Sequence, residues 1–355
     1  MRVGVQMVFQ SYGYGPEVSD GQVVAEEVRL GVLADELGFD ALWPVEHHFE
    51  DYAFCPDNAV FLANMAARTQ RIQLGTGAVI LPWNDPLRVA EKISLLDHLA
   101  GGRVLFGVGR GLARREYQGF GIPMDESRDR FDEAARMVVD ALESGWIEGK
   151  GPYYRQPRTP IRPAPVRGFR DRLYCVAMSP DSVLAAADLG ARMVVFSQRP
   201  WEDQAAAMAT YRERFEAVHG RSPGPPVTCD FVYCDTDPAR AEDKAHEHLA
   251  GYLTSVVEHY ELVSDHFKDA KGYESYGSAV DLLRAIGLER LCDMYLAVQA
   301  WGTPGQILER LHARREVIGD FDLTACFRFA GLPIEDAERS MRTFAREVLP
   351  TLHGS

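Results

Sequence analysis

The sequence has few of the features that mark disulfide-rich, metal-binding or membrane proteins. Its six cysteines are scattered and form no Cys-x-x-Cys pair, which gives no indication of a zinc site or a disulfide framework. No apolar run is long enough to cross a bilayer, and the chain enters a strand pattern at residues 3–9, which leaves no room for a signal peptide. We therefore expect a cytoplasmic protein with reduced cysteines and no membrane partner.

Positive charge is also in short supply. The chain has 38 lysines and arginines against 52 aspartates and glutamates, a formal net charge of −14. Affinity for nucleic acids depends mainly on concentrated lysine and arginine, so this balance argues against a nucleic-acid partner. The chain has 355 residues, 46% of them hydrophobic, and can bury a large core. We expect an acidic enzyme with a single domain over residues 1–355.

Short apolar runs alternate along the chain with longer amphipathic stretches. This alternation predicts an α/β fold with parallel strands joined by crossover helices. Eight strands with helices between them are the number that a (β/α)8 TIM barrel needs. The predicted strands are residues 3–9, 41–45, 72–80, 104–108, 173–177, 193–196, 227–233 and 323–329.

Two stretches interrupt this rhythm. Residues 152–172 are rich in proline and arginine, which disfavours a helix and predicts an extended loop over the barrel. Residues 261–298 form an irregular insertion before the last strand. After it, Gly302-Thr303-Pro304 begins another helix, with Thr303 as N-cap and Pro304 at the first helical position.

In a barrel of this kind the chemistry lies at the carboxyl ends of the strands. The second predicted strand is followed by Glu46-His47-His48-Phe49. Histidine exchanges a proton near neutral pH, so a histidine here can serve as an acid–base or hydrogen-bonding group. The alternative is that both histidines are structural. No third metal ligand follows at a recognisable spacing, so no metal site is predicted.

Two further strand ends carry groups that suit an anion. Gly109-Arg110-Gly111 follows the fourth strand; the glycines allow close approach of the backbone, and the arginine can clamp a phosphate. The spacing is not the dinucleotide fingerprint. Ser179-Pro180-Asp181-Ser182 follows the fifth strand and is either a phosphate-binding helix start or a plain helix cap. One anion can contact both neighbouring strand ends.

With these motifs together, the chain resembles the luciferase-like, flavin-dependent monooxygenases, in particular the catalytic alpha subunit of bacterial luciferase. The resemblance runs nearly end to end. Besides the two-histidine motif and Arg110-Gly111-Leu112, it is carried by Ala41-Leu42-Trp43, Gly75-Thr76 to Leu81-Pro82, Leu95-Leu96-Asp97, Gly102-Arg103 to Phe106-Gly107, Lys271-Gly272-Tyr273 and Gly302-Thr303-Pro304.

The resemblance implies roles for individual residues. His47 matches the family's catalytic histidine, and Glu46 and His48 beside it are the other catalytic candidates. A cis peptide bond between Gly77 and Ala78 is implied under the flavin ring. The candidate cofactor-binding residues are Gly77, Ala78, Gly109, Arg110, Leu112, Glu116, Met178, Ser179 and Ser182. Residues 261–298 correspond to the family's mobile lid, which shields a reactive intermediate from water.

The chain also departs from the luciferase pattern. Gly109 stands where luciferase has a reactive cysteine beside the flavin, and Met178 replaces a glutamate near the phosphate. We therefore do not extend the resemblance to light emission. Gly109 frees space for a substrate bulkier than a straight-chain aldehyde, and Trp83 is expected to shape the same pocket.

The activity implied is that of a two-component monooxygenase. A separate NAD(P)H flavin reductase supplies reduced FMN (FMNH2), which reacts with O2 to a C4a-(hydro)peroxyflavin that oxygenates a small organic substrate, such as an aldehyde, ketone or aromatic compound. The resemblance also implies a homodimer. Two alternatives remain, because fold alone does not fix chemistry: an F420-dependent hydride-transfer enzyme, and a non-catalytic flavin-binding partner subunit. The luciferase beta subunit lacks most of the lid, so its presence here favours a catalytic chain.

Overall fold

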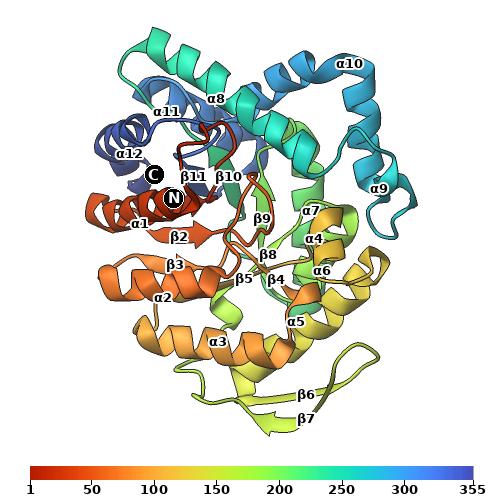
Figure 1. Cartoon of the computed structure of the whole chain (residues 1–355). Coiled ribbons are helices and arrows are strands. Elements are labelled where there is room, and N and C mark those ends of the chain that lie inside the picture. Colours follow the sequence, from red (N-terminus) through yellow and green to blue (C-terminus); the bar gives the residue numbers. More distant parts are fainter. Residues whose placement is uncertain (355) are drawn as a thin grey trace.

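The computed structural model describes residues 1–354, and a closed parallel sheet lies at its centre (Figure 1). The strands follow the order β3-β2-β1-β11-β10-β9-β8-β5, and pairing of β3 with β5 closes the ring, which confirms the (β/α)8 barrel. The short strand β4 continues beside β5. The barrel strands are β1 (Val3–Met7), β2 (Ala41–Pro44), β3 (Gln73–Gly75), β4 (Val79–Ile80), β5 (Val104–Gly109), β8 (Leu173–Val176), β9 (Arg192–Phe196), β10 (Val227–Phe231) and β11 (Asp322–Cys326).

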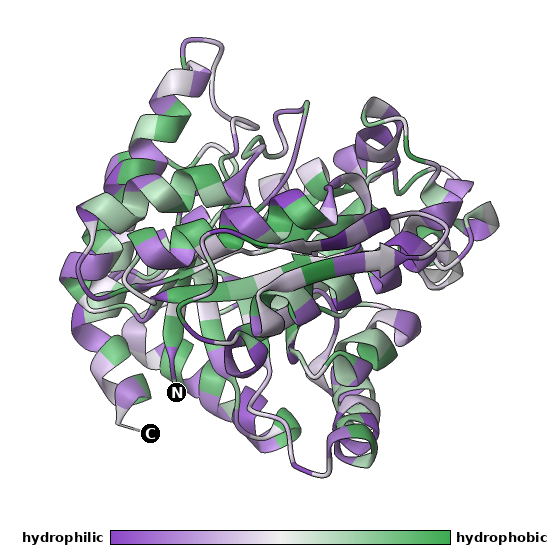
Figure 2. Cartoon of the chain, turned by 90° about the horizontal axis from the view of Figure 1, so that it is seen from below, coloured by the Kyte–Doolittle hydropathy of each residue, from purple (hydrophilic) through white to green (hydrophobic). Residues whose placement is uncertain are grey.

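Helices surround this ring. Their faces alternate between hydrophobic and hydrophilic residues, as expected for helices packed on a sheet (Figure 2). The helices longer than eight residues are α1 (Asp20–Leu37), α2 (Asn58–Arg68), α3 (Pro86–Leu99), α5 (Ser127–Ser144), α6 (Pro180–Asp188), α7 (Trp201–His219), α8 (Pro238–His259), α10 (Glu274–Val298), α11 (Pro304–Ile318) and α12 (Ile334–Glu347). The shorter ones are α4 (Arg114–Gly119), α9 (His266–Asp269), α13 (Leu349–His353), η1 (Leu81–Trp83), η2 (Met124–Glu126) and η3 (Arg170–Arg172). No helix in the described part of the chain is long and apolar enough to span a membrane.

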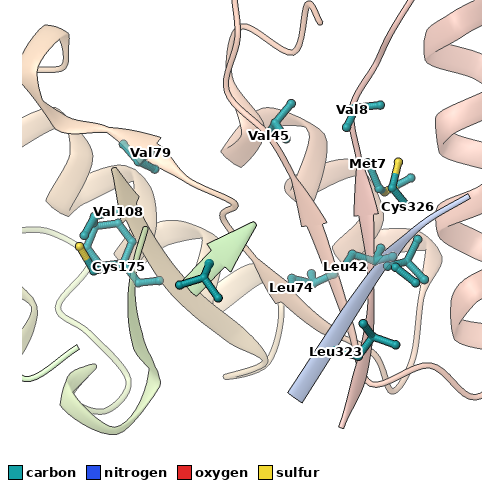
Figure 3. Close-up of a cluster of buried hydrophobic side chains, with 14 of the residues drawn as sticks. Met7, Val8, Leu42, Val45, Leu74, Val79, Val108, Cys175, Leu323 and Cys326 are labelled. Atoms are coloured by element: carbon teal, nitrogen blue, oxygen red, sulfur yellow. The ribbon is translucent and has the colours of Figure 1, made fainter. Parts of the chain in front are cut away.

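Strand alternation builds two separate apolar layers. In β2, Ala41 and Trp43 belong to a small cluster inside the barrel, whereas Leu42 belongs to the large layer between the strands and the helices. Figure 3 shows residues of that outer layer, with Leu42 and Leu74 on adjacent strands. Because both faces of a parallel sheet are covered, its strands consist of almost continuous apolar runs. This is the pattern from which the strands were predicted.

Three predicted segments differ from the structure, and the first two lie in a strand and in a loop. The strand expected over residues 72–80 is split into β3 and β4, since the Thr76 hydroxyl group binds the backbone of Gly107 on β5 and interrupts the ladder. The loop expected over residues 152–172 is wrong in part, because it contains β7 (Arg155–Pro160), which pairs antiparallel with β6 (Trp146–Lys150). The hairpin packs on α5, at the outside of the barrel (Figure 1). Proline is tolerated in such an edge strand because the backbone on its outer side pairs with no further strand and needs no N–H donor.

The insertion is mostly helical, whereas an irregular segment was expected. It contains α9 and α10, and α8 packs against α10. The next helix, α11, lies between α7 and α12 in the outer ring and so takes the place of the crossover helix before β11. The segment that covers the barrel therefore begins with α8, earlier than residue 261. The N-cap at Thr303 is confirmed: its side chain accepts from the Gln306 amide in a capping box, with Pro304 at the first position.

Candidate functional site

A pocket opens at the carboxyl ends of the strands. Its walls come from the segments that follow β2, β3, β5, β8 and β9, and its cover comes from α8 and α10. The lining residues among those predicted as site residues are Glu46, His47, Gly77, Ala78, Gly109, Arg110, Leu112, Met178 and Ser182. Four strand ends that are far apart in the sequence therefore meet in one cavity, where barrel enzymes hold their chemistry.

His47 is held by a buried carboxylate. Its Nδ1 lies 2.9 Å from Oε1 of Glu116 on α4, and the same oxygen accepts the backbone N–H of His48 at 2.8 Å. Burial alone would raise the pKa of Glu116, but His47, His259 and the His48 amide outweigh it and the pKa is lowered. An ionised carboxylate only accepts, which assigns the proton to Nδ1 of His47. Nε2 is then left to accept a proton from a ligand in the pocket.

A second histidine lies beside this pair. His259, the last residue of α8, has its ring centre 5.4 Å from that of His47 and stacks on Tyr52 at 4.3 Å. Its Nδ1 binds Glu50 at 2.8 Å. Burial and the neighbouring His47 lower the pKa of His259 to about 4, so its ring is neutral at pH 7.

Glu46 and His48, the other catalytic candidates, contact residues behind the pocket wall. The Glu46 carboxylate accepts from the indole of Trp83 at 2.7 Å and from the Asn84 amide at 2.9 Å. The His48 ring packs on Phe120 at 4.7 Å and does not line the pocket. Trp83 does not line the pocket either, so the expectation that it shapes the cavity is wrong: its indole is turned to Glu46.

Arg110 has the geometry of an anion-binding group. It is 7% exposed; Nη2 donates to the carbonyl of Gly272 at 2.8 Å, and the guanidinium lies 3.8 Å from the ring centre of Tyr273. Its Nη1 is buried and has no hydrogen-bond partner among the described residues. A buried charged donor without an acceptor is costly, so this atom indicates a missing negative ligand. Gly272 and Tyr273 belong to the insertion, which thus closes onto the site.

The start of α6 lies at the same side of the pocket. Ser179 caps the helix, and the Ser179 and Ser182 hydroxyl groups form a reciprocal capping box with an Oγ–Oγ distance of 3.0 Å. Ser182 lines the pocket, whereas Ser179 lies behind it. Met178 lines the pocket, and its sulfur accepts the amide of Phe196 at 3.1 Å. Both serines therefore cap the helix, and only Ser182, in the N-terminal turn of α6, lines the pocket.

The floor of the pocket is backbone with small side chains. The Gly77–Ala78 peptide bond is cis, as the resemblance implied. Asn58 donates to the Ala78 carbonyl at 3.0 Å and fixes its direction. A Cβ at Gly109 would lie 3.0 Å from Ile80. The glycine therefore leaves this part of the floor without a side chain that projects into the pocket.

Sequence reasoning missed several residues. Arg128, in the first turn of α5, has its Nε and Nη2 buried without hydrogen-bond partners among the residues described, and with Asp181 of α6 it lines a second pocket. The cover contributes Tyr252, Tyr260 and Tyr276 to the pocket. An arginine in the first turn of a helix is a signal that could have been noticed, since that position does not complement the helix dipole. Tyr252 and Tyr260 gave no comparable signal because α8 was taken as an ordinary crossover helix, and Tyr276 lies in the segment expected to be the lid but was not singled out.

Comparisons with known proteins agree with this architecture. The sequence model of the luciferase-like monooxygenases matches residues 1–320. The alkanal monooxygenase alpha chain of Photobacterium leiognathi is 27% identical over 352 residues, covering 96% of this chain and 97% of that protein. The crystal structure of the monooxygenase RslO1 from Streptomyces bottropensis superposes with a TM-score of 0.80 at 29% identity, covering 99% and 100% of the two chains.

Two more distant structures share the fold. The oxygenating constituent of 3,6-diketocamphane monooxygenase from Pseudomonas putida, a type II Baeyer-Villiger monooxygenase solved with FMN, gives a TM-score of 0.78 at 19% identity over 99% of this chain and 98% of that one. The F420-dependent tetrahydromethanopterin reductase of Methanopyrus kandleri gives 0.71 at 18% identity over 99% of both chains.

Proposed function

The chain belongs to the luciferase-like monooxygenases, and from this premise we propose that it is a two-component monooxygenase that uses reduced FMN and O2 to oxygenate a small organic substrate. The observation that carries the proposal is one pocket that holds both the buried Nη1 of Arg110, which has no hydrogen-bond partner in the described part of the chain, and the carboxylate-bound ring of His47. The first group suits the phosphate of a cofactor and the second suits proton transfer at its reactive end.

The residues present fit FMN. Arg110 and the N-terminal turn of α6 with Ser182 would hold its phosphate, and Arg128 adds two buried donors nearby. The low surface formed by Gly77, Ala78 and Gly109 would lie against its ring. When bound, reduced FMN supplies the two electrons with which one atom of O2 is inserted into the substrate and the other is reduced to water.

The chain's own contribution is positioning, exclusion of water and proton handling. Glu116 accepts a hydrogen bond from Nδ1–H of His47, which leaves Nε2 as the acceptor toward the pocket. The cover of α8 and α10 places three tyrosines over the cavity, and the bonds from Arg110 and Tyr273 hold the insertion on the barrel. A cover of this kind limits the access of bulk water to the reacting atoms.

The test follows O2 uptake and product formation with chemically reduced FMN and a panel of ketones, aldehydes and aromatic compounds under isotopically labelled O2. We expect label in a product, and we expect His47→Ala to lower its formation about 10²–10⁴-fold while FMN binding is retained. His312→Ala, on the exposed face of α11 beside Glu316, is the matched control. Equal turnover by His47→Ala with saturating reduced FMN would refute the role of His47.

An F420-dependent reductase shares this fold, so F420-dependent hydride transfer is the competing function to be tested. A hydride-transfer enzyme turns over without O2, whereas the proposed monooxygenase requires O2. Product formation under anaerobic conditions with reduced F420 would therefore favour the competing function.

The proposal includes partners and an assembly. A separate NAD(P)H-dependent flavin reductase would supply the reduced FMN, and the six free cysteines suit the reducing cytoplasm. The neighbouring helices α2 and α3 leave Val60, Leu95 and Leu99 between 49% and 66% exposed. We propose this face of α2 and α3 as the interface of the homodimer, because pairing of two copies would cover these exposed apolar side chains.

A further inference from the structure

Three side chains with metal-binding atoms meet at one side of the pocket, at the end of β2. One ring nitrogen of His47, one ring nitrogen of His259 and one carboxylate oxygen of Glu116 all lie within 4.8 Å of one another. Sequence spacing gave no reason to expect this cluster, because its members are 69 and 143 residues apart along the chain. Two imidazoles and a carboxylate are a ligand set that suits Zn²⁺ and related first-row ions.

His259 is already arranged as a metal ligand. Its side chain is 1% exposed, and the Glu50 carboxylate accepts from Nδ1 at 2.8 Å. The other ring nitrogen, Nε2, therefore carries the lone pair, and it is buried without a hydrogen-bond partner among the described residues. A carboxylate that binds the far nitrogen of a histidine is the usual outer-sphere arrangement in metal sites. Arg115 in turn holds Glu50.

We propose that His47, Glu116 and His259 bind a divalent first-row transition-metal ion, such as Zn²⁺, beside the pocket. Ligand atoms around a tetrahedral Zn²⁺ lie about 3.3 Å apart, given bonds of about 2.0–2.1 Å. The His47–Glu116 distance of 2.9 Å and the 4.8 Å limit of the cluster bracket this value. Three protein ligands leave a fourth position open for water or a ligand oxygen.

Metal binding changes the protonation of His47. The ion takes the place of the proton that Nδ1 shares with Glu116, so the neutral ring must carry its proton on Nε2. Nε2 then donates toward the pocket, where it accepted before. This step rests on the proposed function: the bound ion would inhibit oxygenation by removing the proton acceptor.

The test uses the full-length, flavin-free protein after dialysis against a chelator. Titration with Co²⁺ is followed by its visible d–d absorption, and Zn²⁺ binding is measured by calorimetry. We expect one ion per chain with the intense absorption of a low-coordinate site. His259→Gln and Glu116→Gln should weaken binding at least about 10-fold, and Glu50→Gln about 10–100-fold, since it only orients His259.

His248→Gln is the matched control. His248 lies on the same helix and is 5% exposed, and its buried Nε2 also has no hydrogen-bond partner among the described residues, with the Glu247 carboxylate 3.5 Å away; it does not belong to the cluster. Its replacement should leave Co²⁺ binding unchanged. Circular dichroism and thermal unfolding check that each variant folds, and Glu50, whose side chain is 26% exposed, provides a variant outside the core.

Two results would overturn the proposal: no saturable Co²⁺ or Zn²⁺ binding up to millimolar concentration, or binding that His259→Gln, Glu116→Gln and Glu50→Gln all leave unchanged. Metal binding that depends on the three residues but does not inhibit oxygenation supports the site and contradicts the role of His47 in the proposed function. The binding measurements therefore test the metal site, and the activity measurements test the role of His47, so that one proposal can fail without the other.

Discussion

Replacement of Arg110 by methionine tests whether the guanidinium binds the phosphate of the cofactor. The side chain is 7% exposed and has one buried nitrogen, Nη1, without a partner among the described residues. A hydrogen bond to a charged group contributes about 1.5–3 kcal/mol. At about 1.4 kcal/mol per factor of ten, its loss should weaken FMN binding roughly 10–150-fold. Riboflavin lacks the phosphate, so its dissociation constant should change less than about 2-fold on the same scale.

The assay is equilibrium binding of FMN and riboflavin, followed by flavin fluorescence, with the native chain and Arg110→Met. Arg158→Met is the control, because Arg158 stacks on Trp146 in the remote hairpin. The reasoning fails if both ligands lose affinity equally, since Arg110 would then act only by holding Gly272 and Tyr273 of the cover. It also fails if neither ligand is affected.

Three further perturbations follow from the packing and the charges. Gly107→Ala should destabilise the fold by about 3 kcal/mol or more in urea unfolding, because its Cβ would lie 2.1 Å from the Thr76 carbonyl oxygen; Gly305→Ala, with open space around its Cβ, should cost nothing. Burial raises the pKa of Glu27 from 4.5 to about 7, against the lowering by Arg328. The folded chain thus holds this proton more tightly, and up to about 3 kcal/mol of stability present below pH 4.5 is lost as pH rises through 7. Glu27→Gln should remove this loss of stability between pH 4.5 and 7. If the free energy of unfolding of the variant depends on pH as that of the native chain does, the assignment to Glu27 is contradicted. Val60→Asp on α2 should convert the expected dimer to monomers of 39.6 kDa in sedimentation; a native chain that is already monomeric would exclude this interface.

Much of the fold could be predicted because its signals are local. Each buried strand is an apolar run, and Gly38 at the end of α1 adopts a left-handed φ of 94° as a helix C-cap does. The hairpin of β6 and β7 could not be predicted in this way. Its strands alternate poorly, lie largely exposed and contain Pro157 and Pro160, so only their mutual pairing and packing on α5 define them.

The site was predictable as a set of strand ends and not as a set of contacts. The motifs after β2, β5 and β8 converge because all parallel strands of a barrel end at one mouth. Which of two adjacent histidines faces the cavity depends on a distant group, since Glu116 binds His47 by its ring and His48 by its backbone. His259 reaches the site only because α8 leaves the outer ring, which no local pattern indicates.

The same cluster takes part in both proposals, and the species between His47 and Glu116 decides whether Nε2 of His47 accepts or donates toward the pocket. With a proton there, the carboxylate fixes the tautomer, and Nε2 of His47 is an acceptor toward the pocket. With a metal ion there, His259 becomes the third ligand and Nε2 becomes a donor. His259 is neutral at pH 7 because its pKa is about 4, so it does not repel the ion, and the lone pair of its Nε2 has no partner among the described residues. Competition between one proton and one divalent ion for a single oxygen–nitrogen pair therefore links metal availability to the proton acceptor in the pocket.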